Sequence, residues 1–309
     1  MDLYCIGELL IDFIPGTEPA SYVRNAGGAP ANVAIAAARN GLDAGMCCTV
    51  GKDDFGPFLL DTLKENGVKA LQPKLSTEAV TTMAFVTLTA DGDRKFTFAR
   101  KPGADMLLSE EDVKEEEVAS SAIVHAGSFS LSASPCREAT IKALKLGHKY
   151  DKLVSFDVNY RNLVWNDDVD ACAKEVFQIL PYVDILKISE EEVEMMGGEA
   201  NLPKLMADNG ITLIVETLGA EGAKCFFGGK VFDIPGRKAK CVDATGAGDA
   251  FWGGFLSSLR IQGVGAPEQL TEEIIRTAMN YGNISGWLCV QSKGAISSLP
   301  TRAEIEKYL

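Results

Sequence analysis

One stretch decides how the chain folds: Asp243-Ala244-Thr245-Gly246-Ala247-Gly248-Asp249-Ala250-Phe251-Trp252-Gly253-Gly254-Phe255-Leu256. It reads as a glycine-rich turn that continues into a helix. Gly246 and Gly248 give access to backbone angles that a Cβ forbids, so consecutive N–H groups, including that of Ala247, converge on one anion. The first N–H groups of a helix lack internal partners, and the dipole adds about half a positive charge there. The stretch therefore predicts a phosphate-binding turn at a helix start.

Asp249 is the unusual residue of this turn. A carboxylate in a first helical turn is favoured by roughly 0.3 to 1 kcal/mol and is expected to stay ionised at neutral pH. It would nevertheless repel a bound phosphate, so we expect it to remove a proton from a hydroxyl that attacks the phosphate. The plainer alternative is a helix N-cap. Phe251, Phe255 and Leu259 recur every four residues and predict an apolar stripe that anchors this helix in the core.

The run DATGAGDAFWGGF closely resembles the C-terminal signature of the ribokinase-like (PfkB) carbohydrate kinases, in which Asp249 takes the position of the catalytic base. The resemblance implies an α/β fold, a three-layer sandwich with a mostly parallel central sheet and a small β lid. It covers nearly the whole chain, so we expect residues 1–309 to form one kinase domain.

The composition excludes several classes of function. The 309 residues are 46% hydrophobic and carry a net charge of -13, which argues against nucleic acid or an anionic membrane as partner. Eight cysteines without a C-x-x-C pair predict buried thiols of a reducing compartment, and two distant histidines make a zinc site improbable. Without a signal peptide or an apolar run of roughly 18 residues, we expect a cytoplasmic protein.

Two N-terminal segments are candidates for sugar binding. Residues 3–14 predict one buried strand, in which Asp12 is either a satisfied core acid or a ligand for sugar hydroxyls at the carboxyl edge of the sheet. Gly27 and Gly28 precede an alanine-rich helix that bears Asn32, an amide donor and acceptor. The plainer interpretation is a glycine-rich loop before an alanine-rich helix, but the segment resembles the sugar-binding signature of the family.

Residues 76–100 interrupt the alternation of strands and helices. Two alternating runs, 80–89 and 94–98, flank the turn Asp91-Gly92-Asp93 and predict an antiparallel hairpin. With residues 13–24 we expect it to form a lid that excludes water, and its apolar face and open edges predict a homodimer. Arg100 follows in RKPGAD, which looks like the fructokinase-type members and implies a substrate contact. The alternative is a solvated surface charge.

A strand over 153–158 ends in Asp157, Asn159 and Arg161, alternate positions that we expect on one side of an extended backbone. Arg161 is the candidate cation between substrate and phosphoryl group, and a similar D-x-N-x-R occurs in fructokinases and 2-keto-3-deoxygluconate kinases. The family's N-x-x-E motif, which helps to organise Mg²⁺ and phosphate, corresponds to Ser189 and Glu192. Serine replaces asparagine here, with a shorter reach.

The resemblance also implies sites for a nucleotide and a monovalent cation. The turn with Thr217, Gly219 and Gly222 resembles the family's nucleotide-binding loop, to which Gly248 also contributes, and Asn283 takes the place of a residue beside the adenine. A potassium-type site built largely from carbonyl groups is implied at Asp243, Thr245, Cys289, Gly294 and Ser298. Such a cation would hold the 246–248 turn in shape.

Together these features predict a sugar kinase that uses ATP and Mg²⁺, most similar to fructokinases. Phosphorylation of 2-keto-3-deoxygluconate, ribose or a nucleoside remains an alternative, since these substrates differ in lid contacts that spacing does not resolve. Two other classes stay open, a non-catalytic sugar- or nucleotide-binding regulator and a purely structural α/β protein. The intact Asp249 and the paired glycine loops argue against both.

Overall fold

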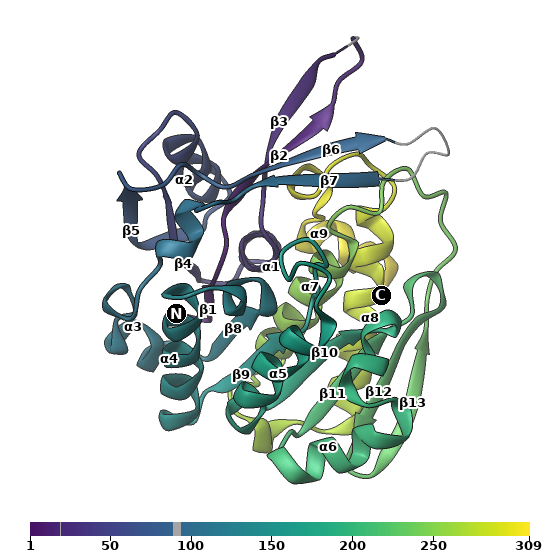
Figure 1. Ribbon diagram of the computed structural model, residues 1–309. Coiled ribbons are helices and arrows are strands. Elements are labelled where there is room, and N and C mark those ends of the chain that lie inside the picture. Colours follow the sequence, from purple (N-terminus) through teal and green to yellow (C-terminus); the bar gives the residue numbers. More distant parts are fainter. Residues whose placement is uncertain (19, 89–93) are drawn as a thin grey trace.

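The computed structural model describes residues 1–18, 20–88 and 94–309, which form two sheets and their covering helices (Figure 1). The larger sheet has the strand order β13-β12-β11-β10-β9-β8-β1-β4-β5. Its strands are β1 (Leu3–Ile6), β4 (Ala44–Gly51), β5 (Lys69–Ser76), β8 (Ile123–Gly127), β9 (Leu153–Asp157), β10 (Ile185–Ser189), β11 (Leu213–Thr217), β12 (Gly222–Phe227) and β13 (Lys230–Pro235). Neighbours are parallel except at β11–β12 and β12–β13, so the predicted mostly parallel sheet is confirmed.

Helices cover both faces of this sheet. One hydrophobic cluster contains residues of α1 (Ala29–Arg39), α2 (Phe55–Glu65), α7 (Ala247–Ile261) and α8 (Glu272–Cys289). The other contains residues of α3 (Glu115–Ala119), α4 (Cys136–Lys149), α5 (Val169–Ile179) and α6 (Leu202–Asn209); α9 (Arg302–Ile305) contacts α8. Strand β1 serves both clusters, because Leu3 and Cys5 belong to the first and Tyr4 and Ile6 to the second. The fold is therefore the predicted three-layer sandwich.

Helix α7 packs closely against two neighbouring helices. A Cβ at Gly253 would lie 2.5 Å from the Cβ of Ala36 in α1, and one at Gly254 would lie 2.8 Å from the Cβ of Ser285 in α8. The two glycines therefore let both helices approach α7. This packing fixes the N-terminal end of α7, where the candidate site lies.

A smaller sheet projects from this body (Figure 1). Its order is β3-β2-β6-β7, from β2 (Leu10–Pro15), β3 (Tyr22–Gly27), β6 (Met83–Leu88) and β7 (Arg94–Ala99). The antiparallel β6–β7 pair confirms the hairpin, although β6 begins at Met83 rather than at residue 80, and the predicted turn Asp91-Gly92-Asp93 lies outside the described residues. The prediction of one strand over 3–14 is wrong. The chain turns at Gly7, with φ 145°, and passes from the larger sheet into the smaller one.

The expectation for the cysteines needs correction. All eight cysteines are free and seven are buried, but Cys241 is exposed, so the prediction of a buried thiol fails there. Helix α8 begins at Glu272, where the Thr271 side chain accepts a hydrogen bond from the Ile274 N–H and caps the helix. No helix in the described ranges is long and apolar enough to cross a membrane.

Candidate active site

The turn before α7 depends on one of its two glycines for its shape. Gly246 has φ 77°, in the left-handed region, and a Cβ there would lie 2.8 Å from the Cβ of Ala295. Gly248 is helical, so the prediction that its backbone needs special angles is wrong; a Cβ there would lie 3.6 Å from Lys187 Nζ. The Ala247 N–H donates to the Ala244 carbonyl at 3.1 Å and helps to close the turn, whereas the sequence predicted that it faces an anion.

Asp249 lies in the first turn of α7 and is 9% exposed. Its Oδ2 accepts a hydrogen bond from Asn32 Nδ2 of α1 at 2.7 Å. Burial raises the pKa of Asp249, while the Asn32 hydrogen bond and the nearby charge of Arg161 act in the opposite direction. The carboxyl group thus contacts a side chain of another helix instead of capping its own, since Gly246 is the N-cap of α7.

Asp249 and Gly246 line a cavity of about 160 Å³, here called the Asp12 cavity. The other lining residues are Glu8, Leu10, Asp12, Gly28, Ala29, Asn32, Phe98, Phe129, Asn159, Arg161, Asn162, Leu163 and Thr245. It therefore gathers Asp12, Gly28, Asn32, Arg161 and Asp249, which the sequence assigned to substrate and catalysis.

Asp12 reaches this cavity from the smaller sheet. Its strand, β2, is not part of the central sheet, so the expected position at the carboxyl edge of that sheet is wrong. A Cβ at Gly27 would lie 2.1 Å from Asp12 Oδ2, so Gly27 leaves the space that the carboxyl group occupies. Burial raises the pKa of Asp12 to about 6, with a further contribution from Asp249.

Glu8 is a lining residue for which no role was expected from sequence. It lies between β1 and β2 and is 3% exposed. Its Oε1 accepts a hydrogen bond from the Ala29 N–H at 2.8 Å, whereas Oε2 has no partner among the residues that the structure describes. Burial raises the pKa of Glu8 to about 8, and the carboxylates of Asp105 and Asp249 add to the shift. A third acidic group therefore borders the Asp12 cavity.

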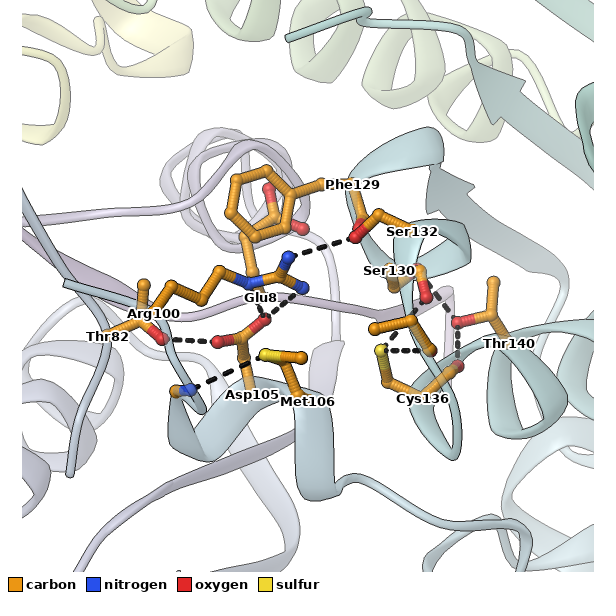
Figure 2. Close-up of polar contacts among 12 residues, drawn as sticks. Glu8, Thr82, Arg100, Asp105, Met106, Phe129, Ser130, Ser132, Cys136 and Thr140 are labelled. Carbon is orange, nitrogen blue, oxygen red and sulfur yellow. Dashed lines mark hydrogen bonds and ion pairs between the residues drawn. The ribbon is translucent and has the colours of Figure 1, made fainter. Parts of the chain in front are cut away.

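Arg100 does not line this cavity but packs against Phe129, which does (Figure 2). Its guanidinium pairs with Asp105 Oδ2, at 2.9 Å from Nε and 2.7 Å from Nη2, and donates from Nη1 to Ser132 Oγ at 2.9 Å. It also lies over the Phe129 ring, with Cζ 4.4 Å from the ring centroid. With a side chain only 8% exposed, Arg100 is not the solvated surface charge of the alternative interpretation. It supports Phe129, a lining residue, and Asp105 holds it in place.

The segment after β9 differs from its prediction. Asn159 has φ 40°, so the backbone turns and does not hold Asp157, Asn159 and Arg161 on one side of an extended strand. Arg161 is exposed, and its Nη1 donates to the carbonyl of Tyr160 at 3.0 Å. Asp157 points elsewhere and pairs with Lys187 Nζ at 2.8 Å. Arg161 and Asn159 nevertheless both line the Asp12 cavity.

A second cavity, of about 330 Å³, lies on the other side of the turn and is here called the Trp287 cavity. Its lining residues are Thr217, Gly219, Ala220, Gly222, Gly236, Arg237, Ala239, Cys241, Ala244, Ala247, Gly248, Phe251, Asn283, Gly286, Trp287 and Val290. Five residues that the sequence analysis assigned to nucleotide binding line this cavity: Thr217, Gly219, Gly222, Gly248 and Asn283. Asn283 Nδ2 donates to the carbonyls of Ile234 and Pro235, at 3.1 and 3.2 Å, and ties α8 to the end of β13. The two cavities meet at residues 246–249.

Ser189 and Glu192 lie where β10 ends. Glu192 Oε2 accepts from the Ser189 N–H at 2.8 Å and Oε1 from the Tyr160 N–H at 2.7 Å, so the carboxylate joins the segments that follow β9 and β10. Burial raises the pKa of Glu192, and the Asp157 charge adds to this, while Lys187 opposes it. Within the described ranges, no group of three or more His, Cys, Asp or Glu residues is placed to hold a metal ion.

The five residues assigned to a monovalent cation form one network below the turn. Asp243 Oδ1 accepts from Thr245 N and Oγ1, at 2.8 and 2.7 Å, and Oδ2 accepts from the Gly294 N–H at 3.0 Å. Cys289 Sγ donates to the Thr245 carbonyl at 3.8 Å and lies 3.0 Å from Ser298 Oγ, which donates to the Gly294 carbonyl. Oxygen atoms of the kind that bind hard cations are therefore concentrated here.

Several lining residues carry no motif in the sequence. Phe98, Phe129 and Leu163 border the Asp12 cavity, and Arg237 and Trp287 border the Trp287 cavity. Aromatic and aliphatic residues of this kind look like ordinary core positions in a sequence. Only the RKPGAD stretch, which follows Phe98 closely, pointed toward this region.

The chain is similar in sequence to known carbohydrate kinases. A sequence model described as pfkB family carbohydrate kinase matches residues 1–302. Fructokinase-1 of Oryza sativa subsp. japonica is 38% identical over 314 residues, covering 98% of this chain and 96% of the relative, and probable fructokinase-5 of Arabidopsis thaliana is 38% identical over 317 residues, covering 98% and 95%.

Solved structures show the same likeness. A Xylella fastidiosa fructokinase with bound ATP superimposes with a TM-score of 0.90 at 29% identity, covering 99% of this chain and 97% of that one. A Vibrio cholerae O395 fructokinase with fructose, ADP and calcium gives 0.89 at 32% identity, covering 100% and 98%. An aminoimidazole riboside kinase of Salmonella enterica gives 0.86 at 27% identity, covering 99% of both chains.

Proposed function

Because this chain belongs to the pfkB family of carbohydrate kinases, we propose that it transfers the γ-phosphoryl group of ATP to fructose and forms fructose 6-phosphate. The observation that carries the proposal is the position of Asp249, whose turn separates the Asp12 cavity from the Trp287 cavity. A sugar in the first cavity and a nucleotide in the second would meet at this turn. The fructokinase names of the relatives favour fructose among the sugars.

Asp249 is proposed as the catalytic base. Its Oδ2 accepts the proton of the attacking sugar hydroxyl, and the 2.7 Å hydrogen bond from Asn32 fixes the direction of the carboxyl group. Negative charge that develops on the phosphoryl group is stabilised by the N-terminal end of α7, which Gly246 and Gly248 leave open. Both effects depend on positioning, because phosphoryl transfer itself needs little covalent chemistry from the protein.

The remaining assignments follow the two cavities. For the sugar we propose Asp12, Asn32 and the Gly27–Gly28 turn, with Arg161 at the open side, and Arg100 acting only through Phe129. For the nucleotide we propose Thr217, Gly219, Gly222, Gly248 and Asn283. Ser189 and Glu192, which are not lining residues of either cavity, we propose near its phosphates because they correspond to the N-x-x-E motif.

Mg²⁺ supplies charge neutralisation on the phosphates when bound. Both Glu192 oxygens already accept backbone N–H groups, so this residue fits an indirect role through water rather than a direct bond to the ion. The oxygen-rich network of Asp243, Thr245, Cys289, Gly294 and Ser298 fits a potassium-type ion. The dependence of turnover on the monovalent cation is measured by comparing kcat in potassium salts with kcat in tetramethylammonium salts. Equal rates in both salts would contradict the cation site.

The smaller sheet is proposed as a lid within a single kinase domain of residues 1–309 and as the surface of a homodimer. Its edge strand β3 exposes Tyr22 and Val23, at 47% and 54%, and pairs on one side only, with β2, among the described strands. Val23→Asp should therefore give a monomer where the parent chain gives a dimer in light scattering. A parent chain that is monomeric at micromolar concentration would contradict the proposal.

The eight free thiols favour a reducing compartment, and we propose the cytoplasm.

A panel of sugars tests the substrate. ADP release is measured with fructose, 2-keto-3-deoxygluconate, ribose and a nucleoside at matched concentrations, with Mg²⁺ and potassium present. The proposal predicts the highest kcat/KM with fructose. A higher value for any other acceptor would replace fructose while leaving the kinase assignment intact, and absence of turnover with every acceptor would favour a non-catalytic regulator.

A further inference from the structure

A buried ion pair lies at the carboxyl ends of two neighbouring strands and has no part in the function described so far. Lys187 of β10 and Asp157 of β9 are register partners in the central sheet. Lys187 Nζ lies 2.8 Å from Asp157 Oδ2, and the residues are 5% and 2% exposed. The chain thus holds a lysine ammonium inside the protein, where charges are costly unless they are paired.

The ammonium group lies directly behind the turn at which the two cavities meet. The position that a Cβ of Gly248 would occupy is 3.6 Å from Lys187 Nζ and 4.0 Å from its Cε. Gly248 lines the Trp287 cavity, and the next residue, Asp249, lines the Asp12 cavity. A larger side chain at position 248 would stand between the ammonium group and the turn. The glycine therefore leaves this approach open.

The lysine is held in its charged form. Burial alone would lower the pKa of Lys187, but the carboxylates of Asp157, Glu192 and Asp249 outweigh it and raise the pKa above its usual value. An ammonium group has three donors, and within the described part of the chain Asp157 is its one hydrogen-bond partner. Glu192 uses both oxygens on backbone N–H groups. Donors of Lys187 thus remain for a ligand.

We propose that Lys187 is a catalytic residue whose ammonium group binds the transferring phosphoryl group beside Gly248, and that Asp157 is the positioning residue that orients it. The inference rests on the proposed transfer at this turn. In that step the sugar oxygen forms a bond to the γ-phosphorus as the bond to the β–γ bridging oxygen breaks. The electron pair leaves on ADP, the hydroxyl proton passes to Asp249, and Lys187 keeps its own proton throughout.

This assignment differs from the one drawn from the sequence, in which Arg161 was the cation at the phosphoryl group. Arg161 is exposed and donates to the adjacent Tyr160 carbonyl, whereas Lys187 is buried at the junction. A charge excluded from water interacts more strongly with a phosphoryl group than an exposed one does. Lys187 should therefore contribute more to turnover than Arg161.

The competing explanation is an ion pair that only stabilises the sheet, and three variants separate the two. Lys187→Met leaves Asp157 unpaired, Lys187→Arg keeps the charge, and the double variant Asp157→Asn/Lys187→Met removes both charges together. Replacing both members of a buried pair is often neutral for stability, so the double variant should remain folded. Lys224→Met is the matched control, because Lys224 also forms an ion pair, with Glu199 at 2.8 Å, but none of its atoms is among those next to the Cβ position of Gly248.

The first measurement is kcat with ATP and fructose, together with the melting temperature. The second is the tightening of ADP binding by aluminium fluoride in the presence of fructose, a mimic of the phosphoryl group in transfer. We expect Lys187→Met and the double variant to lose about 10²- to 10³-fold in kcat, to keep their affinity for ADP alone, and to lose the fluoride effect. Lys187→Arg should recover part of each.

A folded double variant with kcat within about threefold of the parent chain would overturn the proposal, and so would a fluoride effect that survives in it. If Lys187→Met alone unfolds, the double variant still decides. Failure of the proposed function looks different, since the parent chain would then turn over no sugar, or the Asp249→Asn variant would keep full turnover. The variants of Lys187 therefore test the inference when the parent chain phosphorylates a sugar and the Asp249→Asn variant loses turnover.

Discussion

The two cavities on either side of the 246–249 turn are lined by contrasting chemistry. The Asp12 cavity, of about 160 Å³, has three acidic side chains in its wall, those of Glu8, Asp12 and Asp249. The Trp287 cavity, of about 330 Å³, has no acidic residue among its described lining and is bordered mainly by glycine, alanine and apolar side chains. One wall presents carboxyl groups to its ligand, and the other presents backbone and hydrophobic surface.

This difference suggests two modes of recognition. A sugar is defined by its hydroxyl groups, which need directed side-chain partners, and loss of one such partner leaves a buried group unpaired. A purine base has a flat apolar face that any complementary surface accommodates. We therefore expect substitutions that remove a hydrogen-bonding group to be severe around the Asp12 cavity, and single substitutions to be mild around the Trp287 cavity.

The largest effect should come from Asp249→Asn at the boundary between the cavities. The amide cannot accept the hydroxyl proton, so kcat should fall by at least about 10²- to 10⁴-fold. Isothermal titration should show that fructose and ATP still bind. Turnover near that of the parent chain would remove the base from the mechanism and with it the role of this boundary.

A smaller loss is expected for Asp12→Ala on the sugar side. Removing a charged hydrogen-bond partner costs about 1.5 to 3 kcal/mol, so kcat/KM for fructose should fall roughly 10- to 100-fold, with the KM for ATP unchanged. Asn25→Ala is the control, because Asn25 lies opposite Asp12 on β3 but does not line the cavity. Equal losses in the two variants would mean that the strand pair, not the carboxyl group, matters.

On the nucleotide side, Trp287→Ala should have a milder effect. The half-buried indole offers a stacking surface, and its loss should raise the KM for ATP by about tenfold without changing the KM for fructose. Tyr308→Ala serves as control, since its ring contacts Trp287 at 4.8 Å but lies outside the cavity. A change in the KM for fructose of similar size would break the division between the two cavities.

The smallest effect on turnover is expected for Glu8→Gln, whose consequence lies in stability. The folded-state pKa of Glu8, about 8, exceeds its ordinary value of 4.5, so the folded chain binds an extra proton between these values. The stabilisation is complete below pH 4.5 and is lost as the pH rises through 8, with about 1.4 kcal/mol for each pKa unit.

Urea unfolding at pH 5.5 and pH 8.5 measures this difference. The parent chain should lose stability relative to Glu8→Gln as the pH rises, because glutamine keeps an acceptor for the Ala29 N–H and does not titrate. Glu110→Gln, an exposed substitution, should follow the parent chain at both values. Parallel pH profiles for all three proteins would show that Glu8 does not keep its proton in the folded state.

Local sequence patterns were sufficient to predict the parts of the site in which a single turn is followed directly by a helix. The glycines and Asp249 at the start of α7, and Asn32 in α1, are of this kind. Arg100 was assigned to the substrate, but its packing against Asp105 and Phe129 could not be predicted, and Lys187 with its partner Asp157 was not assigned, because these contacts depend on which strands and loops become neighbours. The division of residues 3–14 between two sheets was also not predicted. A continuous apolar run is compatible with one strand, and the change of direction at Gly7 is not visible in the hydrophobic pattern.

The hydrogen bond between Asn32 and Asp249 joins positions 217 residues apart. During synthesis, Asn32 emerges from the ribosome while most of the chain, including the whole of α7, is still untranslated. A truncated product that ends before α7 would contain Asp12, Asn32 and Arg161 but not Asp249. On the proposed role of Asp249 as the base, a nascent chain would acquire transfer activity only after α7 has been translated.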